Sequence, residues 1–234
     1  MKKSRILIKI SGEVLMGKKK YGHDVDVVEQ ICKNIKEVYK SGYEICIVVG
    51  GGNIFRGNKY EEMRIEKVSA DYAGMIATVI NGIILQDKLS KGGLITKLIA
   101  NNNINNVVEK YIREKTISSL KKGKIIIFVE GISNPCFSTD TNAVIKAIEM
   151  NCSLLLKGTN VDGVYSEDPK VSKNIKKYKK INYNDIITKE INIMDQTAII
   201  LAKKHSIPVK VFDISKNLEL NRVLLNKGSF TLIN

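Results

Sequence analysis

Two lysines each lie in a short apolar run, where an ammonium is costly to bury. Lys9 belongs to ILIKI and is followed by Ser11 and Gly12, and Lys157 ends SLLLK. A lysine in a strand that is buried on both faces needs an anionic partner. We therefore predict that Lys9 binds a phosphate, with the neighbouring serine and glycine amides beside it. The alternative is an edge strand from which Lys9 extends its ammonium to solvent.

Three consecutive glycines, Gly50, Gly51 and Gly52, follow the apolar run EICIVV and precede Arg56. Backbone N–H groups approach phosphate oxygens closely where no Cβ intervenes, so this loop predicts an anion cradle with Arg56 as a charge-assisted clamp. A tight turn is the alternative. The loop matches neither G-x-x-x-x-G-K-[ST] nor G-x-G-x-x-G at the start of a helix. The phosphate site must therefore use another arrangement.

Two further loops carry hydroxyl, amide and carboxylate side chains. SNPCFSTD offers Ser138, Thr139 and helix amides for a second phosphate, and Asp140 could organise nearby lysines, although a capping turn is the alternative. KGTNVDGVYSEDP could hold a base and a ribose, with a turn at Asp-Gly as its alternative. Its candidate side chains and glycine are Asn160, Asp162, Gly163, Tyr165 and Asp168. Together these loops predict two phosphoryl groups brought face to face, which is the geometry of phosphoryl transfer.

Short β-branched runs alternate with segments of helical periodicity and predict the elements that position these loops. The predicted strands are residues 6–10, 44–49, 124–129, 153–157 and 209–214. The predicted helices are residues 25–42, 70–90, 141–151 and 194–206, the third with Asp140 in its N-cap region. This alternation favours an α/β fold whose parallel sheet is covered on both faces. Ligands collect at the carboxyl ends of the strands in such sheets.

The composition is that of an ordinary globular protein. The 234 residues predict a single domain, residues 1–234, with at most two lobes divided near residue 150. We expect no membrane partner and a cytoplasmic location, because no apolar run approaches the length that spans a bilayer and no signal peptide is recognisable. The four cysteines and two histidines are scattered, which argues against a disulfide framework or a zinc site.

The formal net charge of +14 is the strongest compositional signal. Such a charge invites a nucleic-acid hypothesis through phosphate neutralisation. The lysines are spread over the whole chain, however, and no RNP, KH or zinc-finger signature appears. Nucleic acid is therefore not expected as a partner, and anionic small substrates would be served equally well by this field.

A set of motifs resembles a known family in order and spacing. The motifs are KISGE, VVGGGNIFRG, SADYAGMIATVINGIILQD, NPCFSTD, LLKGTNVDGVYSEDPK, IMDQTA and IPVKVFDI. They resemble the bacterial uridylate (UMP) kinases of the amino acid kinase family, from about residue 5 to the C-terminus. The resemblance implies a three-layer αβα sandwich around a mainly parallel sheet. It also implies transfer of the γ-phosphoryl of MgATP to UMP to give UDP, in pyrimidine nucleotide biosynthesis, by a homohexamer.

The resemblance also assigns roles to residues by position. The implied catalytic residues are Lys9, Asp140, Lys157 and Asp195. The implied ATP site contains Lys9, Ile10, Ser11, Gly12, Gly52, Arg56, Thr159, Asn160, Tyr165 and Asp168. The implied UMP site contains Gly51, Asp71, Ile132, Ser133, Asn134, Pro135, Cys136, Phe137, Ser138 and Thr139. Mg²⁺ is expected to be held mainly by the phosphates, without a direct protein ligand. On sequence alone Asp195 is as readily a helix N-cap.

The chain departs from the family pattern in the loop before Asn-Pro. The usual segment there is of the type GTGNP, whereas this chain reads GISNP, so Ile132 supplies no hydroxyl and only its backbone could serve. Two other functions stay open. The first is a kinase that acts on a small acid such as acetylglutamate or aspartate, against which Asp71 and SNPCFSTD favour a nucleotide acceptor. The second is a nucleotide-sensing or nucleic-acid-binding regulator, against which Lys9, Arg56 and Asp195 argue.

Overall fold

The computed structural model describes residues 4–56, 60–102, 104, 106–166 and 175–234. The strands are β1 (Arg5–Ile10), β2 (Glu44–Val49), β3 (Thr96–Ala100), β4 (Glu109–Lys110), β5 (Ile125–Phe128), β6 (Leu154–Thr159), β7 (Val164–Tyr165), β8 (Lys177–Tyr178), β9 (Lys180–Ile181), β10 (Val209–Asp213) and β11 (Phe230–Ile233). The helices are α1 (Gly12–Leu15), α2 (Val25–Lys40), α3 (Lys67–Lys91), α4 (Arg113–Lys121), α5 (Thr139–Glu149), α6 (Tyr183–Thr188), α7 (Gln196–Lys204) and α8 (Glu219–Leu224).

A nine-stranded sheet runs through the molecule in the order β4-β3-β5-β2-β1-β6-β10-β11-β9. Its neighbouring strands are parallel, apart from the antiparallel pair β10 and β11. A separate two-stranded sheet joins β7 to β8. The mainly parallel sheet was predicted correctly from the apolar runs.

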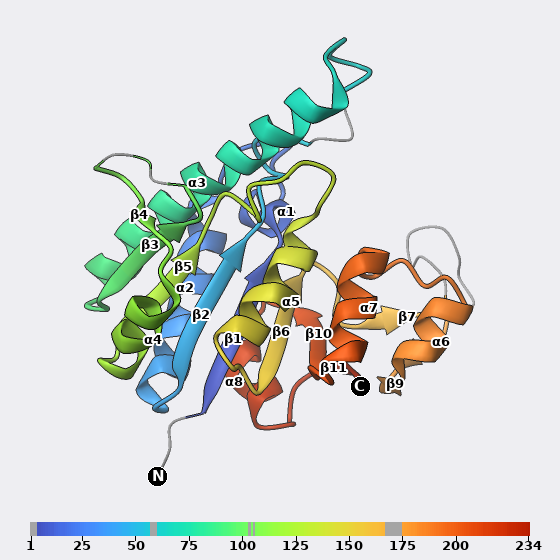
Figure 1. Cartoon of the computed structure of the whole chain (residues 1–234). Helices are drawn as coiled ribbons and strands as arrows, with labels where there is room; N and C mark the ends of the chain where they lie inside the picture. The colour runs from blue at the N-terminus through green and yellow to red at the C-terminus, as the bar shows by residue number, and fades with distance from the viewer. Residues whose placement is uncertain (1–3, 57–59, 103, 105, 167–174) are drawn as a thin grey trace.

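Helices cover both faces of the sheet, so the fold has three layers (Figure 1). Side chains of α1, α2, α3 and α8 form a core on one face, and those of α4, α5, α6 and α7 form a core on the other. Successive residues of a strand point to opposite faces. In β1, Ile6 and Ile8 belong to the first core and Leu7 to the second. Lys9 shares the face of Leu7 and therefore points toward α5.

The two helices next to the predicted site begin at clear caps. Asp24 caps α2 by accepting hydrogen bonds from the amides of Asp26 and Val27, as its position before the periodic apolar residues favours. The N-cap region of α5 was expected at Asp140, two residues after the observed N-cap. Ser138 caps this helix, accepting hydrogen bonds from the amides of Asp140 (3.0 Å) and Thr141 (3.4 Å). Asp140 is thereby left free to point away from the helix end.

The expectation that no apolar segment has the length to span a bilayer is wrong for α3. This helix has 25 residues, and its most apolar 18-residue stretch has a mean hydropathy of 1.5. Of that stretch, 44% is buried inside the fold. Val79, Leu85 and Leu89 belong to the core beneath the helix. α3 is therefore a core helix with one apolar face turned outward.

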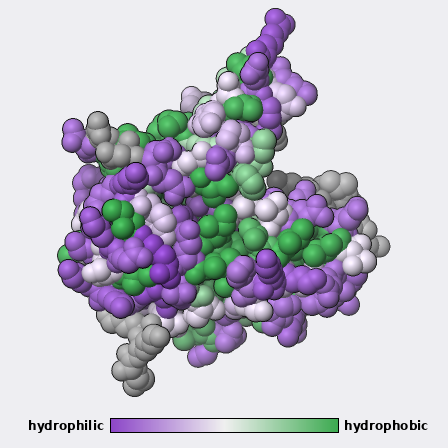
Figure 2. Space-filling model, viewed as in Figure 1, coloured by the Kyte–Doolittle hydropathy of each residue, from purple (hydrophilic) through white to green (hydrophobic). Residues whose placement is uncertain are grey.

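The surface over α4, α5 and α7 is mostly hydrophilic, in keeping with the composition. Figure 2 shows that apolar side chains gather over α5 and α7 toward the middle of the view. Ile200 of α7 and Phe137, just before α5, are exposed apolar side chains. Phe137 belongs to the SNPCFSTD loop.

β1 occupies the middle of the sheet, which excludes the edge-strand alternative for Lys9. It pairs in parallel with β2 on one side and with β6 on the other. Because β2, β1, β6 and β10 run in one direction, their carboxyl ends lie at a single edge of the sheet. The loops that follow these strands therefore converge there.

Candidate functional site

Two ammoniums and one carboxylate form a buried cluster at this edge. Lys9 and Lys157 are direct register partners on β1 and β6, and only 7% and 6% of these residues are exposed. Asp140, in the first turn of α5, lies between them. Lys157 donates a hydrogen bond to its Oδ2, and the Nζ of Lys9 lies 2.8 Å from its Oδ1, an ion pair without hydrogen-bond alignment.

The cluster carries a net positive charge that perturbs its own titration. Burial alone would raise the pKa of Asp140, but Lys157 and Lys9 hold it well below its usual range. Burial lowers the pKa of Lys157 to about 8, with Lys9 acting in the same direction and Asp140 opposing both. Two lysines that share one carboxylate retain capacity for a second anion, such as a phosphate.

Asp195 links the starts of two helices beside this cluster. It is the N-cap of α7 and accepts a hydrogen bond from the amide of Ala198 at 2.9 Å. It also accepts hydrogen bonds from the hydroxyls of Ser138 and Thr141, at the start of α5. The capping role that the sequence suggested is therefore real. It also brings a carboxylate to the end of α5 that carries Asp140.

The glycine loop packs directly against the loop that follows β1. A Cβ on Gly12 would lie 2.5 Å from the amide nitrogen of Gly52, and one on Gly50 would lie 2.8 Å from that of Gly12. A Cβ on Gly51 would lie 2.7 Å from the carbonyl oxygen of Gly74 in α3. These glycines are therefore required by close approach of backbones. Among the described hydrogen bonds, none uses the amides of Gly51 or Gly52 as donors, which leaves them open to a ligand.

A buried amide pair holds the glycine loop from α3 and was not predicted. Asn81 donates hydrogen bonds from its Nδ2 to the carbonyl of Gly50 and to Oδ1 of Asn53, both at 2.7 Å. Asn53 donates in turn to the carbonyl of Gly22 at 2.9 Å. The Nε2 of His23 lies 2.6 Å from Oδ1 of Asn81. This network fixes the loop relative to the helix.

Arg56 lies at the outer end of the glycine loop. Its Nε donates to the carbonyl of Gly52 at 3.2 Å, and its Nη2 lies 3.0 Å from Oε1 of Glu13 in α1. Both side chains are partly exposed. The guanidinium is thus anchored to the two loops that approach the lysine cluster. The sequence prediction did not include Glu13 in this arrangement.

The predicted acceptor loop runs from β5 to α5 and is held by α3. Asp71 of α3 accepts a hydrogen bond from the amide of Cys136 at 2.9 Å. Its two oxygens also accept hydrogen bonds from Lys67, at 2.5 and 2.6 Å. The predicted loop residues are all at least partly exposed, as a ligand-binding surface requires. They are Ile132, Ser133, Asn134, Pro135, Cys136, Phe137, Ser138 and Thr139.

The predicted base and ribose side chains follow β6 on the opposite side of the cluster. The hydroxyl of Thr159 donates a hydrogen bond to the carbonyl of Val161 and accepts one from its amide. Asp162 accepts hydrogen bonds from Tyr165 (2.5 Å) and Lys177 (2.7 Å). Burial would raise the pKa of Asp162, but these donors hold it below its usual range, and Asp162 raises the pKa of Tyr165 to about 12. Asn160 is exposed, and Asp168 lies outside the described residues.

Comparison with known proteins identifies the family of the chain. Residues 4–213 match the amino acid kinase family. The chain belongs to the amino acid kinase family. Uridylate kinase of Wolbachia sp. subsp. Brugia malayi is 44% identical over 233 residues, which are 100% of this chain and 94% of that protein. Uridylate kinase of Rickettsia typhi is 45% identical over 233 residues, with 100% and 96% coverage.

Solved structures of the family superpose closely on this fold. The crystal structure of UMP kinase from Ureaplasma parvum gives a TM-score of 0.94 at 34% identity, with 100% of both chains covered. That of UMP kinase from Bacillus anthracis gives 0.94 at 37% identity, covering 99% of this chain and 96% of the other. The amino acid kinase-like fold predicted from the motifs is confirmed.

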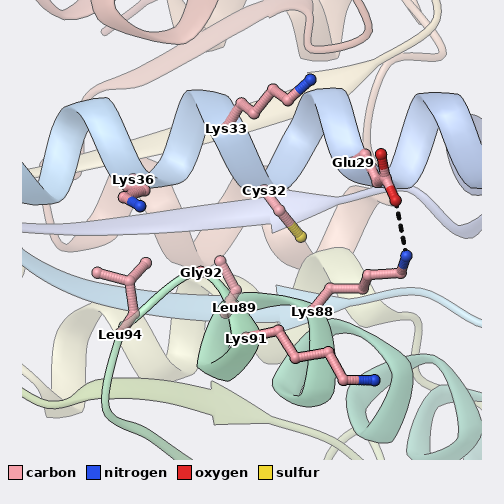
Figure 3. A pocket seen from close by; sticks show the side chains of 9 residues that line it. All are labelled: Glu29, Cys32, Lys33, Lys36, Lys88, Leu89, Lys91, Gly92 and Leu94. Carbon is pink, nitrogen blue, oxygen red and sulfur yellow. Dashed lines mark hydrogen bonds and ion pairs between the residues drawn. The ribbon is translucent and has the colours of Figure 1, made fainter.

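A cavity of about 390 Å³ lies at a distance from the lysine cluster. It opens between α2 and the end of α3 (Figure 3). Glu29 and Lys88 form an ion pair across it, while Lys33 points away from it. The backbone carbonyls at the end of α3 favour cations there. The cavity contains none of the predicted site residues.

Proposed function

We propose that the chain is an ATP-dependent UMP kinase that transfers the γ-phosphoryl group of MgATP to UMP and forms UDP. The observation that carries this proposal is the buried cluster of Lys9, Asp140 and Lys157 at the edge where the loops converge. Full-length similarity to proteins named uridylate kinase supports the choice of substrate. The acceptor loop lies on one side of the cluster for UMP, and the loops after β1, β2 and β6 offer another side for ATP.

The reaction is an in-line displacement between two bound nucleotides. An oxygen of the UMP phosphate attacks the γ-phosphorus of ATP, the bond from that phosphorus to the bridging oxygen breaks, and ADP leaves. No protein base is needed, since a phosphate monoester with a second pKa of about 6 is largely dianionic at neutral pH. Catalysis is then positioning and charge neutralisation. Lys9 and Lys157 neutralise charge on the migrating group, and Asp140 keeps both ammoniums aimed at it.

The two nucleotides occupy opposite sides of this cluster. The donor phosphates lie on the amides of the loop after β1 and on that of Gly52 after β2, with Arg56 closing the outer side, while the amide of Gly51 serves the acceptor. Donor base and ribose lie along the loop after β6, with Asn160 and Tyr165. The acceptor lies between Asp71 and the loop from β5 to α5. Exposed loop residues and the open amides of Gly51 and Gly52 support these assignments.

Mg²⁺ fits this site as an ion carried by the ATP phosphates. The described residues contain no group of three or more His, Cys, Asp or Glu that could enclose a metal. Mg²⁺ commonly keeps several waters and binds through phosphates and one or two carboxylates. Asp140 and Asp195 are the carboxylates near the cluster, and their lysine and hydroxyl partners suit a role through bound water. The ion would neutralise charge on the ATP phosphates.

We also propose that the enzyme works as a homo-oligomer, a hexamer by analogy with the family, and that residues 1–234 act as one domain. The outer face of α3 supports self-association, because exposed apolar residues recur every three or four positions along it. They are Val68, Tyr72, Ile76, Ile80 and Ile83. Such an unpartnered apolar stripe fits a second copy of the same helix. Light scattering after size exclusion tests this: a monomer at micromolar concentration would overturn it.

ADP formation from MgATP tests the proposed activity directly. UMP, CMP, dUMP and acetylglutamate are supplied separately to the purified chain. We expect ADP to be released much faster with UMP than with any of the other three acceptors. Activity with another acceptor alone would overturn the assignment of the acceptor loop, and no activity with any acceptor would overturn the proposed function.

A further inference from the structure

The acceptor loop begins with a run of unusual backbone angles. Glu130 has a φ of 65°, Gly131 of 56° and Ser133 of 63°, and Cys136 follows with 69°. A positive φ is uncommon for residues other than glycine and persists only where surrounding contacts impose it. Three such residues lie in this one loop. Some interaction must therefore hold the loop in place.

The side chain of Glu130 supplies that interaction. Only 9% of this residue is exposed. Its Oε2 accepts hydrogen bonds from the backbone amide of Asn102 and from the hydroxyl of Ser133, each at 3.1 Å, and its Oε1 accepts one from Nδ2 of Asn102 at 2.9 Å. Its own amide donates to the hydroxyl of Thr78, in α3, at 2.7 Å. Glu130 thus joins the loop after β3, α3 and the acceptor loop.

A carboxylate at this position is held by neutral donors. The ion pairs among the described residues include none with Glu130. Burying a carboxylate without a cation is unfavourable unless several hydrogen bonds satisfy it. Three donors from two segments do so here. The arrangement is therefore specific for an acceptor with two oxygens, which an apolar side chain could not replace.

We propose that Glu130 is a positioning residue for the acceptor nucleotide. It fixes the first half of the loop, while the hydrogen bond from the amide of Cys136 to Asp71 fixes the second half. Loss of the carboxylate frees the loop to leave the positive-φ conformation. The acceptor site then has to be ordered during binding, which weakens UMP binding and leaves the donor site intact. This role rests on the proposed function.

Steady-state kinetics of Glu130→Ala and Glu130→Gln test the role. We expect Glu130→Ala to raise KM for UMP by about tenfold or more, because three donors lose their acceptor. KM for MgATP should stay within about twofold. Glu130→Gln should fall between wild type and Glu130→Ala, since its amide oxygen still accepts while its NH₂ meets other donors. Glu130→Gln decides the question if Glu130→Ala does not fold.

Glu44→Ala is the matched control. Glu44 is a half-buried carboxylate paired with Arg5 at the opposite end of the sheet, so its loss lowers stability without touching the acceptor loop. Equal increases in both KM values, or an unchanged KM for UMP, would overturn the role of Glu130 alone. No UMP-dependent ADP formation by the wild-type chain would instead overturn the proposed function together with this role.

Discussion

Replacing Asp140 by asparagine would leave Lys9 and Lys157 buried without their shared anion. Both lysines are less than one-tenth exposed, so water replaces the carboxylate only in part. Removing one partner of a buried ion pair costs about 3–5 kcal/mol of unfolding free energy. For a chain of this size each kcal/mol lowers Tm by about 2–4 °C. We therefore expect Asp140→Asn to lower Tm by roughly 6–20 °C at pH 7.

The loss should depend on pH in a defined direction. Burial has lowered the pKa of Lys157 to about 8, so this lysine is charged at pH 7, where its attraction to Asp140 stabilises the fold. As pH rises through 8, wild-type Lys157 releases its proton and the stabilisation from this ion pair is lost. In Asp140→Asn the pKa falls further, because the carboxylate that opposed the shift is gone. The stability difference between the two proteins should thus shrink between pH 7 and pH 9.5.

Thermal unfolding followed by circular dichroism, with and without MgATP, measures both effects. MgATP should stabilise Asp140→Asn more than wild type, since phosphate oxygens supply the missing negative charge. Glu44→Gln is the control. This variant loses an ion pair far from the site, and its decrease in stability should not vary over the same pH range. A loss below about 1 kcal/mol at pH 7, or one that is constant to pH 9.5, would refute this description of the cluster.

Three further predictions address the loops and the titration. Gly51→Ala should lower stability and turnover, because the new Cβ would lie 2.7 Å from a backbone carbonyl oxygen of α3. Gly74→Ala is the control: its Cβ would meet nothing within 4 Å, and the change should be neutral or stabilising by up to about 1 kcal/mol. Equal Tm shifts for the two variants would contradict this packing. kcat/KM for MgATP should fall as pH rises through about 8, because Lys157 loses its charge; a flat profile to pH 9.5 would count against Lys157 as a phosphate ligand. Asp195→Ala should cost about 1–2 kcal/mol in urea unfolding as α7 loses its N-cap, whereas Asp195→Asn keeps a capping oxygen and should cost less.

The central strands could be predicted because each is a continuous apolar run. β1, β2, β5, β6 and β10 begin and end within two residues of the predicted limits. β3 and β11 were not predicted, since TKLIA and FTLI are short and contain polar residues. Their stability comes from partners that are distant in the sequence: β3 pairs with β5, and β11 with β10 and β9. Pairing of that kind leaves no local signal.

The site residues also divide into those with a local sequence signal and those that distant contacts place. Lys9 and Lys157 could be predicted because an ammonium in an apolar run needs a partner. The partner itself was harder to place, because Ser138 and Asp140 in the sequence STD are both good helix caps. Tertiary contacts decide between them: the serine caps α5 and the aspartate contacts the lysines.

Residues that position the loops were missed for a related reason. Thr78 and Asn81 lie within the apolar segment ATVINGII, and Glu130 follows the apolar β5. A polar residue inside such a run, or directly after it, is the signal that could have indicated them, because a buried polar group must find a hydrogen-bond partner. Which segment supplies the partner depends on how α3 meets the loops, and periodicity does not contain that information.

Turnover of Lys9→Ala tests the central claim most directly, with UMP and MgATP both saturating. We predict a kcat about 10²–10³-fold lower, equivalent to roughly 3–4 kcal/mol of barrier. Lys210→Ala is the matched control: Lys210 is a buried strand lysine, 6% exposed, that donates to the carbonyl of Val223 at 2.6 Å, outside the site. It should lose stability and keep its kcat. A folded Lys9→Ala protein with near-normal kcat would contradict the assignment of the cluster to phosphoryl transfer.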